Sequence, residues 1–299
     1  MMVSVLMLTY NHQEFIAQAI EGVLSQKTTF DIELIIANDY STDNTDSIIK
    51  KIIEKDNNAK EKIKYINNSK NIGMQPNFIL AYNHCKGKYI AECEGDDYWT
   101  DPYKLQKQVD FLESNPEYAI TFHKVKIYNE IKEKFEEDTL NTFTNETTTL
   151  NDLLRGNYIR TVSTVFRNSR KLASLIEKLN DVTPGDWLVF IVTASTGKIR
   201  YINQEMAVYR VSYVGVWSTI DNKQRKYYKE ILNGYEFLYN YLNKDDYTIV
   251  YHSHMHYIGL AAIINKEKGK YLNYYFYKAL LYYRLLRFKY FSGSRHLAQ

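Results

Sequence analysis

Four short apolar runs recur along the first third of the chain and constrain its fold more than any other feature. They occupy residues 3–8, 32–37, 63–66 and 89–93. The runs begin about thirty residues apart, which is the length of a strand, a crossover helix and the next parallel strand. This spacing predicts an α/β fold built on a mostly parallel sheet.

The segments between these runs carry helical signals. Residues 15–24 place their apolar side chains at helical period, with Asn11 and Glu14 in the positions of a cap and its reciprocal partner. A second helix is expected around residues 48–53, after the cap candidates Ser41 and Thr42, and a third over residues 76–84. The pattern predicts helices that alternate with strands and flank the sheet.

Polar residues follow each predicted strand directly. In a parallel sheet the strands end at one common edge, and ligands bind there. Residues far apart in sequence are therefore expected to meet at this edge. They are Thr9, Tyr10 and Asn11, then Asn38, Asp39 and Tyr40, then Asn67 and Asn68, and finally residues 94–97.

The fourth of these segments is acidic, with Glu94, Asp96 and Asp97 within four residues. Carboxylates this close repel one another unless a proton or a cation intervenes, and Mg²⁺ or Mn²⁺ takes such oxygen ligands. The segment therefore predicts a metal site. A solvated acidic turn is the alternative explanation.

Two nucleotide-binding signatures are missing from the sequence. No G-x-G-x-x-G follows the first predicted strand, and no G-x-x-x-x-G-K-[ST] occurs anywhere. This argues against a dinucleotide-binding fold and against a P-loop enzyme. A bound nucleotide diphosphate would instead be neutralised by a cation held on carboxylates.

Several motifs, in their order and spacing over residues 1–217, resemble the inverting glycosyltransferases of the family 2 type. The resemblance implies a GT-A fold. The motifs are residues 3–11, residues 38–43, Asn71-Ile72-Gly73, residues 94–102, Gly185-Asp186-Trp187 and residues 206–210.

The resemblance also implies roles for individual residues. Asp96 and Asp97 match metal ligands for Mn²⁺ or Mg²⁺. Glu94 stands where many relatives carry the first Asp of an Asp-x-Asp motif, Asn38 stands where many carry a second Asp, and Ser212 stands where several carry a His. The positions implied in binding the nucleotide sugar are Thr9, Tyr10, Asn11, Asp39, Asn71, Gly73, Glu94, Asp96, Arg210 and Trp217.

Asp186 matches the general base of that family. A base is required because a sugar hydroxyl is a poor nucleophile until its proton is removed. The reaction implied is a single displacement with inversion at the anomeric carbon, in which the metal stabilises the departing diphosphate. From the sequence alone, Asp186 is equally suited to be the N-cap of the apolar helical segment that follows it.

Arg210 and Trp217 resemble a segment that closes over the substrate in relatives. The Arg would pair with phosphate oxygens and the Trp would stack on a sugar face. Alternatively, Arg210 forms a surface ion pair and Trp217 is a core aromatic residue.

Composition narrows the function classes. A net charge of +3 over 299 residues gives no reason to expect a nucleic-acid partner. Two cysteines are too few for a disulfide framework and fit a reducing compartment. The first apolar run is short and has no basic leader, unlike a signal peptide. We therefore expect a cytoplasmic protein, with peripheral contact at the inner face of the membrane as a further option.

The domain organisation is expected to change near residue 218. Residues 1–218 are the glycosyltransferase domain, with a nucleotide-sugar half over about residues 1–103 and an acceptor half over about residues 104–218. Within the latter, the polar residues 128–149 are expected to form a hairpin or loop. Residues 219–299 carry no strand signals and predict a helical C-terminal region.

The aromatic and basic segment 271–291 within that region is too charged to span a membrane. It is a candidate for peripheral membrane contact, or else part of a packed helical subdomain that forms a contact between copies in a homo-oligomer.

The resulting hypothesis is a metal-dependent hexosyl- or N-acetylhexosaminyltransferase. It would move a sugar from a nucleotide-sugar donor, UDP-linked by family analogy, to a saccharide or lipid-linked glycan acceptor in the synthesis of lipopolysaccharide, capsule or another surface glycan. The alternatives are a metal-dependent nucleotidyltransferase and a non-catalytic nucleotide-binding scaffold. The sequence Thr9-Tyr10-Asn11-His12, in place of a glycine- and arginine-rich loop, argues against a nucleotidyltransferase.

Overall fold

The computed structural model describes residues 1–138, 145–179, 185–212, 233–235, 237–238 and 258. The chain divides into two compact units, one of residues 1–181 and 185–219 and the other of residues 182–184 and 220–299. In the second unit, Tyr235, Leu238 and Ile258 are described and buried. Trp217, the segment 271–291 and nearly all of the predicted C-terminal region lie outside the described residues.

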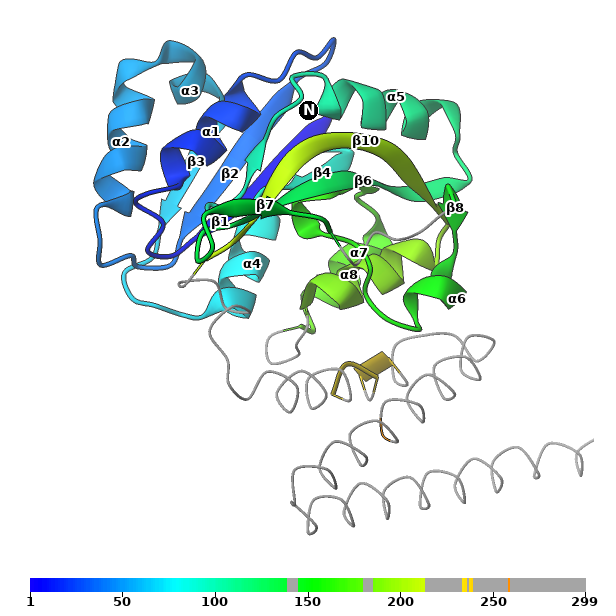
Figure 1. Cartoon of the computed structure of the whole chain (residues 1–299). Coiled ribbons are helices and arrows are strands. Elements are labelled where there is room, and N and C mark those ends of the chain that lie inside the picture. Colours follow the sequence, from blue (N-terminus) through cyan, green and yellow to red (C-terminus); the bar gives the residue numbers. More distant parts are fainter. Residues whose placement is uncertain (139–144, 180–184, 213–232, 236, 239–257, 259–299) are drawn as a thin grey trace, which may run out of the picture. The chain divides into compact units, whose positions relative to one another are not determined.

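A single mixed sheet forms the centre of the first unit (Figure 1). Its strand order is β3-β2-β1-β4-β9-β6-β10-β5, with β7 paired to β6 and β8 to β10. Strands β1 to β4 are parallel along β3-β2-β1-β4, and β10 is parallel to β6. The strands are β1 Val3–Thr9, β2 Ile32–Asn38, β3 Ile63–Asn67, β4 Tyr89–Glu92, β5 Tyr98–Trp99, β6 Tyr118–Asn129, β7 Lys134–Glu136, β8 Thr147–Thr148, β9 Val165–Arg167 and β10 Lys198–Val211.

Helices cover both faces of this sheet. The apolar sides of α1, α2 and α5 pack with Val3, Val5 and Met7 of β1 into one core cluster. On the other face α4 packs on β1 and β2, and α8 packs on β6 (Figure 1). The helices are α1 Ile16–Leu24, α2 Thr45–Lys55, α3 Asn57–Lys62, α4 Met74–Tyr82, α5 Lys104–Ser114, α6 Leu150–Leu153, α7 Arg170–Ile176 and α8 Gly185–Ala194.

The predicted α/β organisation is confirmed. Each apolar run forms a strand whose ends lie within one residue of the prediction. Strands β1 and β4 are buried along almost their whole length, as expected for parallel strands covered on both faces. The polar stretch after residue 128 forms the predicted hairpin, because β7 pairs antiparallel with the end of β6.

The predicted helix caps are wrong. Helix α1 begins at Ile16 and has no side-chain cap. Asn11 instead adopts a left-handed φ of 56°, and its Oδ1 accepts a 2.8 Å hydrogen bond from the backbone N–H of Thr42. Helix α2 begins at Thr45, whose N–H donates to Asp43 at 2.9 Å rather than to Ser41 or Thr42. Asn and Asp bind backbone N–H groups of neighbouring loops as readily as they cap helices.

Within the described part of the chain, no helix has both the length and the apolar character needed to cross a membrane.

Candidate active site

The strand ends meet as the sequence predicted. Thr9 at the end of β1 lies opposite Asn38 of β2, and Asn38 lies opposite Asn67 of β3. Hydrogen bonding between β1 and the chain that follows β4 continues beyond the end of β4, because Gly95 N–H donates to the carbonyl of Leu8 at 2.9 Å. The loops after all four parallel strands therefore start from one edge of the sheet.

The loops after β1 and β2 are fastened to each other. Asn11 bonds to both Thr42 and Ser41. Its Oδ1 accepts from the backbone N–H of Thr42, and its own backbone N–H donates to Ser41 Oγ at 2.9 Å. The rings of Tyr10 and Tyr40 are 43% and 50% exposed beside this junction. Two accessible aromatic rings at the edge are suited to contact a flat base or a sugar face.

Asp39 is buried and fully hydrogen-bonded. Its Oδ1 accepts from the backbone N–H of Ile72 at 2.8 Å and from Asn68 Nδ2 at 2.9 Å, and its Oδ2 accepts from the N–H of Gly73 at 2.8 Å. Gly73 has a φ of 90°, which side chains with a Cβ rarely adopt. Asp39 thus holds the turn of residues 71–73 in place, and its predicted contact with base or ribose remains a prediction.

The acidic segment after β4 gathers three carboxylates. Oxygen atoms of Glu94, Asp96 and Asp97 lie within 4.8 Å of one another. Asp97 Oδ1 accepts a 2.7 Å hydrogen bond from the backbone N–H of Arg210, whereas Oδ2 is buried and has no partner. The alternative of a solvated acidic turn does not fit, because Asp97 is 1% exposed.

Burial and mutual repulsion make this cluster reluctant to ionise. Burial, with the charges of Asp96 and Asp186, raises the pKa of Glu94 to about 8. Burial, followed by repulsion from Asp96 and Glu94, raises the pKa of Asp97 well above its usual range, although Arg210 opposes the shift. A divalent cation would remove this repulsion and occupy the unpartnered oxygen, so the three residues fit Mg²⁺ or Mn²⁺.

Arg210 contacts the cluster through protein groups, and its predicted pairing with phosphate remains a prediction. Its Nη1 donates to the carbonyl of Asp96 at 2.7 Å, its Nη2 donates to Gln18, and its Nε lies 3.1 Å from Glu130. The guanidinium also lies between two rings, 4.9 Å from the centroid of Phe15 and 4.5 Å from that of Tyr98. Its donors are thus directed at protein groups.

Asp186 lies close enough to the cluster for its charge to act on Glu94. It lies in the first turn of α8, which begins at Gly185, so it is not the helix N-cap. Its Oδ2 accepts a 3.3 Å hydrogen bond from Asn157. Burial raises the pKa of Asp186, and its charge contributes to the raised pKa values of Glu94 and Glu92. A raised pKa makes a carboxylate a stronger base.

Sequence reasoning missed the residues that surround these acids. His12 lies beside Asp96, and Asn157 lies beside Asp186. Lys104 is fully buried, with its Nζ 4.2 Å from the ring centroid of Trp99, and burial lowers the pKa of Lys104 to about 7. Only the position of His12, directly after a strand end, gave a signal in the sequence.

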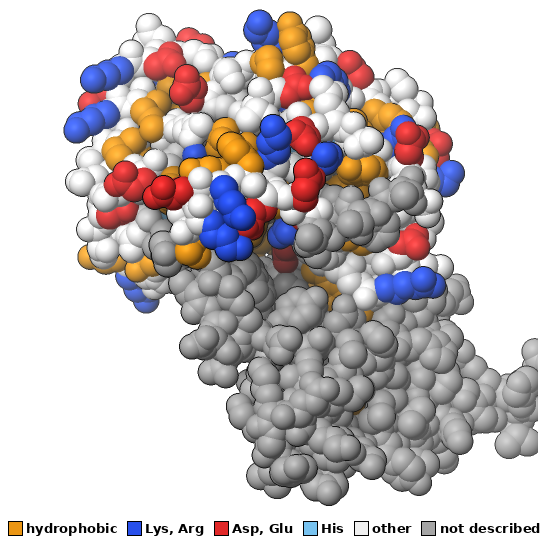
Figure 2. All heavy atoms as spheres, in the orientation of Figure 1, with side chains coloured by type: hydrophobic (Ala, Val, Ile, Leu, Met, Phe, Trp, Pro, Cys, Tyr) orange, Lys and Arg blue, Asp and Glu red, His pale blue; other side chains and the backbone are white. Residues whose placement is uncertain are grey.

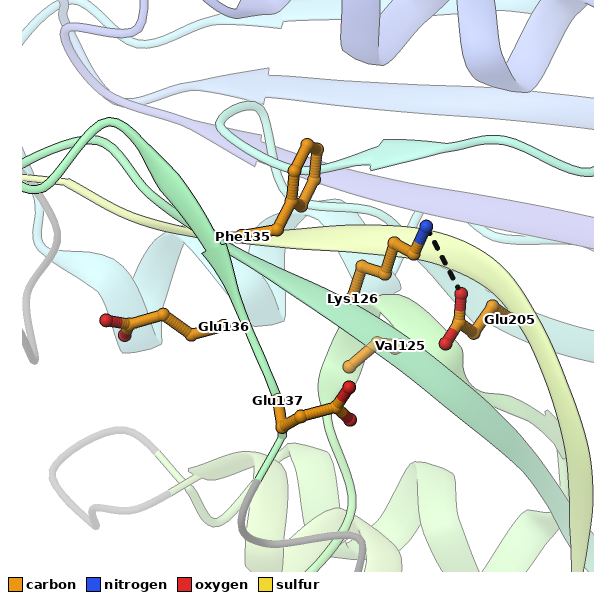
Figure 3. Close-up of a pocket in the computed structure, with 6 residues that line it drawn as sticks. All are labelled: Val125, Lys126, Phe135, Glu136, Glu137 and Glu205. Carbon is orange, nitrogen blue, oxygen red and sulfur yellow. Dashed lines mark ion pairs between the residues drawn. The ribbon is translucent and has the colours of Figure 1, made fainter.

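In the view of Figure 2, acidic and basic side chains intermingle over the described part of the face. A small pocket of about 140 Å³ lies by the hairpin (Figure 3). It is smaller than typical small-molecule sites, and its Lys126 pairs with Glu205 at 3.5 Å. The pocket is lined by Val125, Lys126, Phe135, Glu136, Glu137 and Glu205.

Comparison with known proteins agrees with this geometry. The model of the family described as "Glycosyl transferase family 2" matches residues 4–173, more than half of the chain. The chain belongs to glycosyl transferase family 2. An uncharacterized protein of Mycobacterium tuberculosis is 34% identical over 226 residues, which cover 76% of this chain and 63% of that protein. The chain thus spans less than two thirds of the length of this relative.

A second relative has a named activity. The UDP-Glc:alpha-D-GlcNAc-diphosphoundecaprenol beta-1,3-glucosyltransferase WfaP of Escherichia coli is 38% identical over 113 residues, 38% of this chain and 42% of that protein.

Solved structures show the same GT-A architecture. S. aureus TarS in complex with UDP-GlcNAc superposes with a TM-score of 0.62 at 15% identity, over 98% of this chain and 92% of that chain. The mannosyltransferase PcManGT from Pyrobaculum calidifontis, in complex with GDP-Man and Mn²⁺, gives a TM-score of 0.58 at 14% identity, over 95% and 84%. These similarities confirm the predicted fold class.

Proposed function

We propose that this protein is a metal-dependent inverting glycosyltransferase that uses a nucleotide-sugar donor. One observation supports the proposal above all: Asp97 keeps a buried, unpartnered oxygen within a cluster of three carboxylates, and the charge of Asp186 acts on the same cluster. Such an arrangement has one place for a cation and a separate acid for proton transfer.

Each carboxylate group has its own task in this reaction. Asp96 and Asp97, with Glu94 beside them, would hold Mg²⁺ or Mn²⁺, which supplies positive charge against the donor diphosphate. Asp186 accepts the proton of the acceptor hydroxyl as its oxygen forms a bond to the anomeric carbon. The bond from that carbon to the phosphate oxygen breaks, and the configuration inverts because the two oxygens lie on opposite faces.

The donor site is formed by the loops at the ends of β1, β2 and β3. Thr9, Tyr10 and Asn11 frame the base and ribose, and the turn at Asn71 and Gly73 borders the nucleotide. Arg210 contributes by holding the backbone of Asp96, which the structure supports better than direct pairing with phosphate. Trp217 remains a candidate for stacking on the sugar.

The identity of donor and acceptor is inferred by analogy with relatives. TarS binds UDP-GlcNAc and WfaP is named for UDP-Glc, which favours a UDP-linked hexose or N-acetylhexosamine. PcManGT binds GDP-Man with Mn²⁺, so GDP sugars belong in the same screen. The name of WfaP includes a diphosphoundecaprenol acceptor, which favours a lipid-linked glycan in surface polysaccharide synthesis.

We further propose the domain organisation that the sequence predicted. Residues 1–103 carry the donor and metal residues, and residues 104–218 carry Asp186. The region 219–299 would serve the acceptor, by peripheral membrane contact through residues 271–291 or by association with a second copy.

Calorimetric titration with UDP, GDP and dTDP, each with and without Mn²⁺, tests the donor site. We expect one nucleotide to bind at least about tenfold more tightly with Mn²⁺, because the cation bridges carboxylates and diphosphate. That nucleotide then selects the sugar donors for a transfer assay. Binding of none of the three, under either condition, would contradict the proposed function.

A further inference from the structure

His12 lies next to one carboxylate of the cluster although no metal-site motif includes it. Its Nε2 is 3.9 Å from Asp96 Oδ2, and its side chain is only 14% exposed. The backbone of His12 is fixed as well, because its N–H donates to Thr45 Oγ1 at 2.9 Å. The imidazole therefore faces Asp96 from a rigid loop.

Gly95 provides the space in which the imidazole lies. A Cβ at Gly95 would lie 2.7 Å from Thr9 Oγ1 and 2.9 Å from His12 Nδ1, closer than real Cβ contacts allow. Both of those polar atoms are buried and have no partner. Gly95 thus leaves room for the imidazole, whose Nε2 is the nitrogen that faces Asp96.

His12 stands outside the group of atoms that share the cation site. That group consists of Glu94, Asp96 and Asp97 in the described part of the chain. A nitrogen next to one ligand and apart from the others is placed to orient that ligand rather than to bind the ion. Ligating carboxylates are commonly held by an outer polar partner, and losing that partner weakens metal binding about 10- to 100-fold.

We propose that His12 is a positioning residue for the cation site: its Nε2, 3.9 Å from Asp96 Oδ2, orients that carboxylate. The inference rests on the proposed function, since it assumes that Asp96 binds a divalent cation. It assigns the loop after β1 a second task besides framing the nucleotide.

The test measures Mn²⁺ affinity in the presence of UDP, from the electron paramagnetic resonance signal of free Mn²⁺. His12→Phe keeps a ring of similar size without the N–H, and we expect its affinity to fall about 10- to 100-fold. His12→Gln retains a side-chain N–H and should recover most of this loss. His84→Gln, in a histidine away from the cluster, is the matched control and should bind like wild type.

Gly95→Ala tests the same contact without removing a polar group. The added methyl group must push the Thr9 hydroxyl or the His12 imidazole away, so its Mn²⁺ affinity should fall as in His12→Phe. This variant and His12→Gln keep the inference testable if His12→Phe does not fold, which thermal unfolding would reveal.

The possible results separate the two proposals. A wild-type protein that binds no Mn²⁺ with UDP overturns the proposed function and the inference together. If folded His12→Phe binds Mn²⁺ as tightly as wild type, the inference alone is overturned. The same follows if His12→Gln binds Mn²⁺ as weakly as His12→Phe. A ¹⁴N coupling of directly bound strength in the electron spin echo spectrum of bound Mn²⁺ also overturns it, because His12 would then be a ligand.

Discussion

Asp39 and Asp97 lie in loops that follow two parallel strands at the same edge of the sheet, yet their hydrogen-bonding environments differ. Both are buried, at 4% and 1% exposure. Asp39 accepts three hydrogen bonds, from two backbone N–H groups and an Asn side chain. Asp97 accepts one, from Arg210, and its second oxygen has no partner beside two further acids.

The contrast shows that burial alone does not identify a functional carboxylate. Hydrogen-bond donors satisfy both carboxylate oxygens of Asp39, so its side chain links two loops. Asp97 has one such donor, the backbone N–H of Arg210, and burial raises the pKa of Asp97 well above the usual range. An acid held without enough donors is unfavourable for the metal-free fold, and a bound cation offsets that cost.

The largest effect is expected for Asp97→Asn, which removes the difference in charge and metal binding that sets Asp97 apart from Asp39. The amide keeps the size of the side chain but removes a charge that the cation requires. We expect transfer to fall at least about 1,000-fold and the Mn²⁺ dependence of nucleotide binding to disappear. The metal-free variant should unfold at a temperature no lower than wild type, since repulsion within the cluster decreases.

Transfer kinetics, calorimetry and thermal unfolding measure these three outcomes. Asp110→Asn, on the exposed side of α5, is the control for loss of an acid and should leave all three unchanged. Retained Mn²⁺-dependent binding in Asp97→Asn would show that the cluster is not the cation site.

Asp186→Asn sharpens the comparison, because Asp186 is an acid with partners and a raised pKa but outside the cation group. The amide cannot accept the proton of the acceptor hydroxyl. Transfer should fall about 100- to 10,000-fold, while UDP affinity with Mn²⁺ stays within about twofold of wild type. Full turnover by this variant would exclude Asp186 as the base.

Asp39→Asn is expected to act on structure rather than on chemistry. Its Nδ2 group must face a backbone N–H of Ile72 or Gly73, or else the Asn68 amide, and one buried donor loses its acceptor. The free energy of unfolding should fall by about 1–3 kcal/mol, as urea denaturation would measure. UDP affinity should weaken as the turn of residues 71–73 loosens, whereas Mn²⁺ should still enhance binding. Loss of that enhancement would mean that Asp39 belongs to the cation site.

Much of this site was accessible from the sequence because its elements are local. The strand spacing placed Thr9, Asp39 and Asp97 at one edge, and Asp96 lies next to Asp97 because the two are consecutive in the sequence. The contacts that the sequence could not show depend on tertiary partners. Asn11 satisfies a loop 31 residues away rather than its own helix, and Arg210 is surrounded by groups from α1, β5 and the hairpin.

His12 illustrates the same limit. Its approach to Asp96 depends on a Gly at position 95, and this packing requirement is visible only when the loops after β1 and β4 are side by side. A sequence pattern shows which residues follow a strand, but not which of them lie close enough to contact a residue of another loop.

The smallest effect concerns how the metal-free protein responds to pH, and Glu94→Gln isolates it. Burial raises the pKa of Glu94 to about 8 from an ordinary 4.5. Between these values the folded protein keeps a proton that the unfolded chain has released, so the contribution of Glu94 to stability falls as pH rises. The melting temperature of Glu94→Gln relative to wild type should therefore increase from pH 5 to pH 8, by several degrees at most.

Glu113→Gln provides the control of opposite sign. The hydrogen bond from Lys88 holds the pKa of Glu113 below its usual range, so its small stabilisation is present above the ordinary pKa and disappears as pH falls. Saturating Mg²⁺ should remove the pH-dependent difference between Glu94→Gln and wild type, because the cation stabilises the ionised cluster. A difference that is independent of pH over this range would show that Glu94 is ionised throughout it, and would contradict the raised pKa of Glu94.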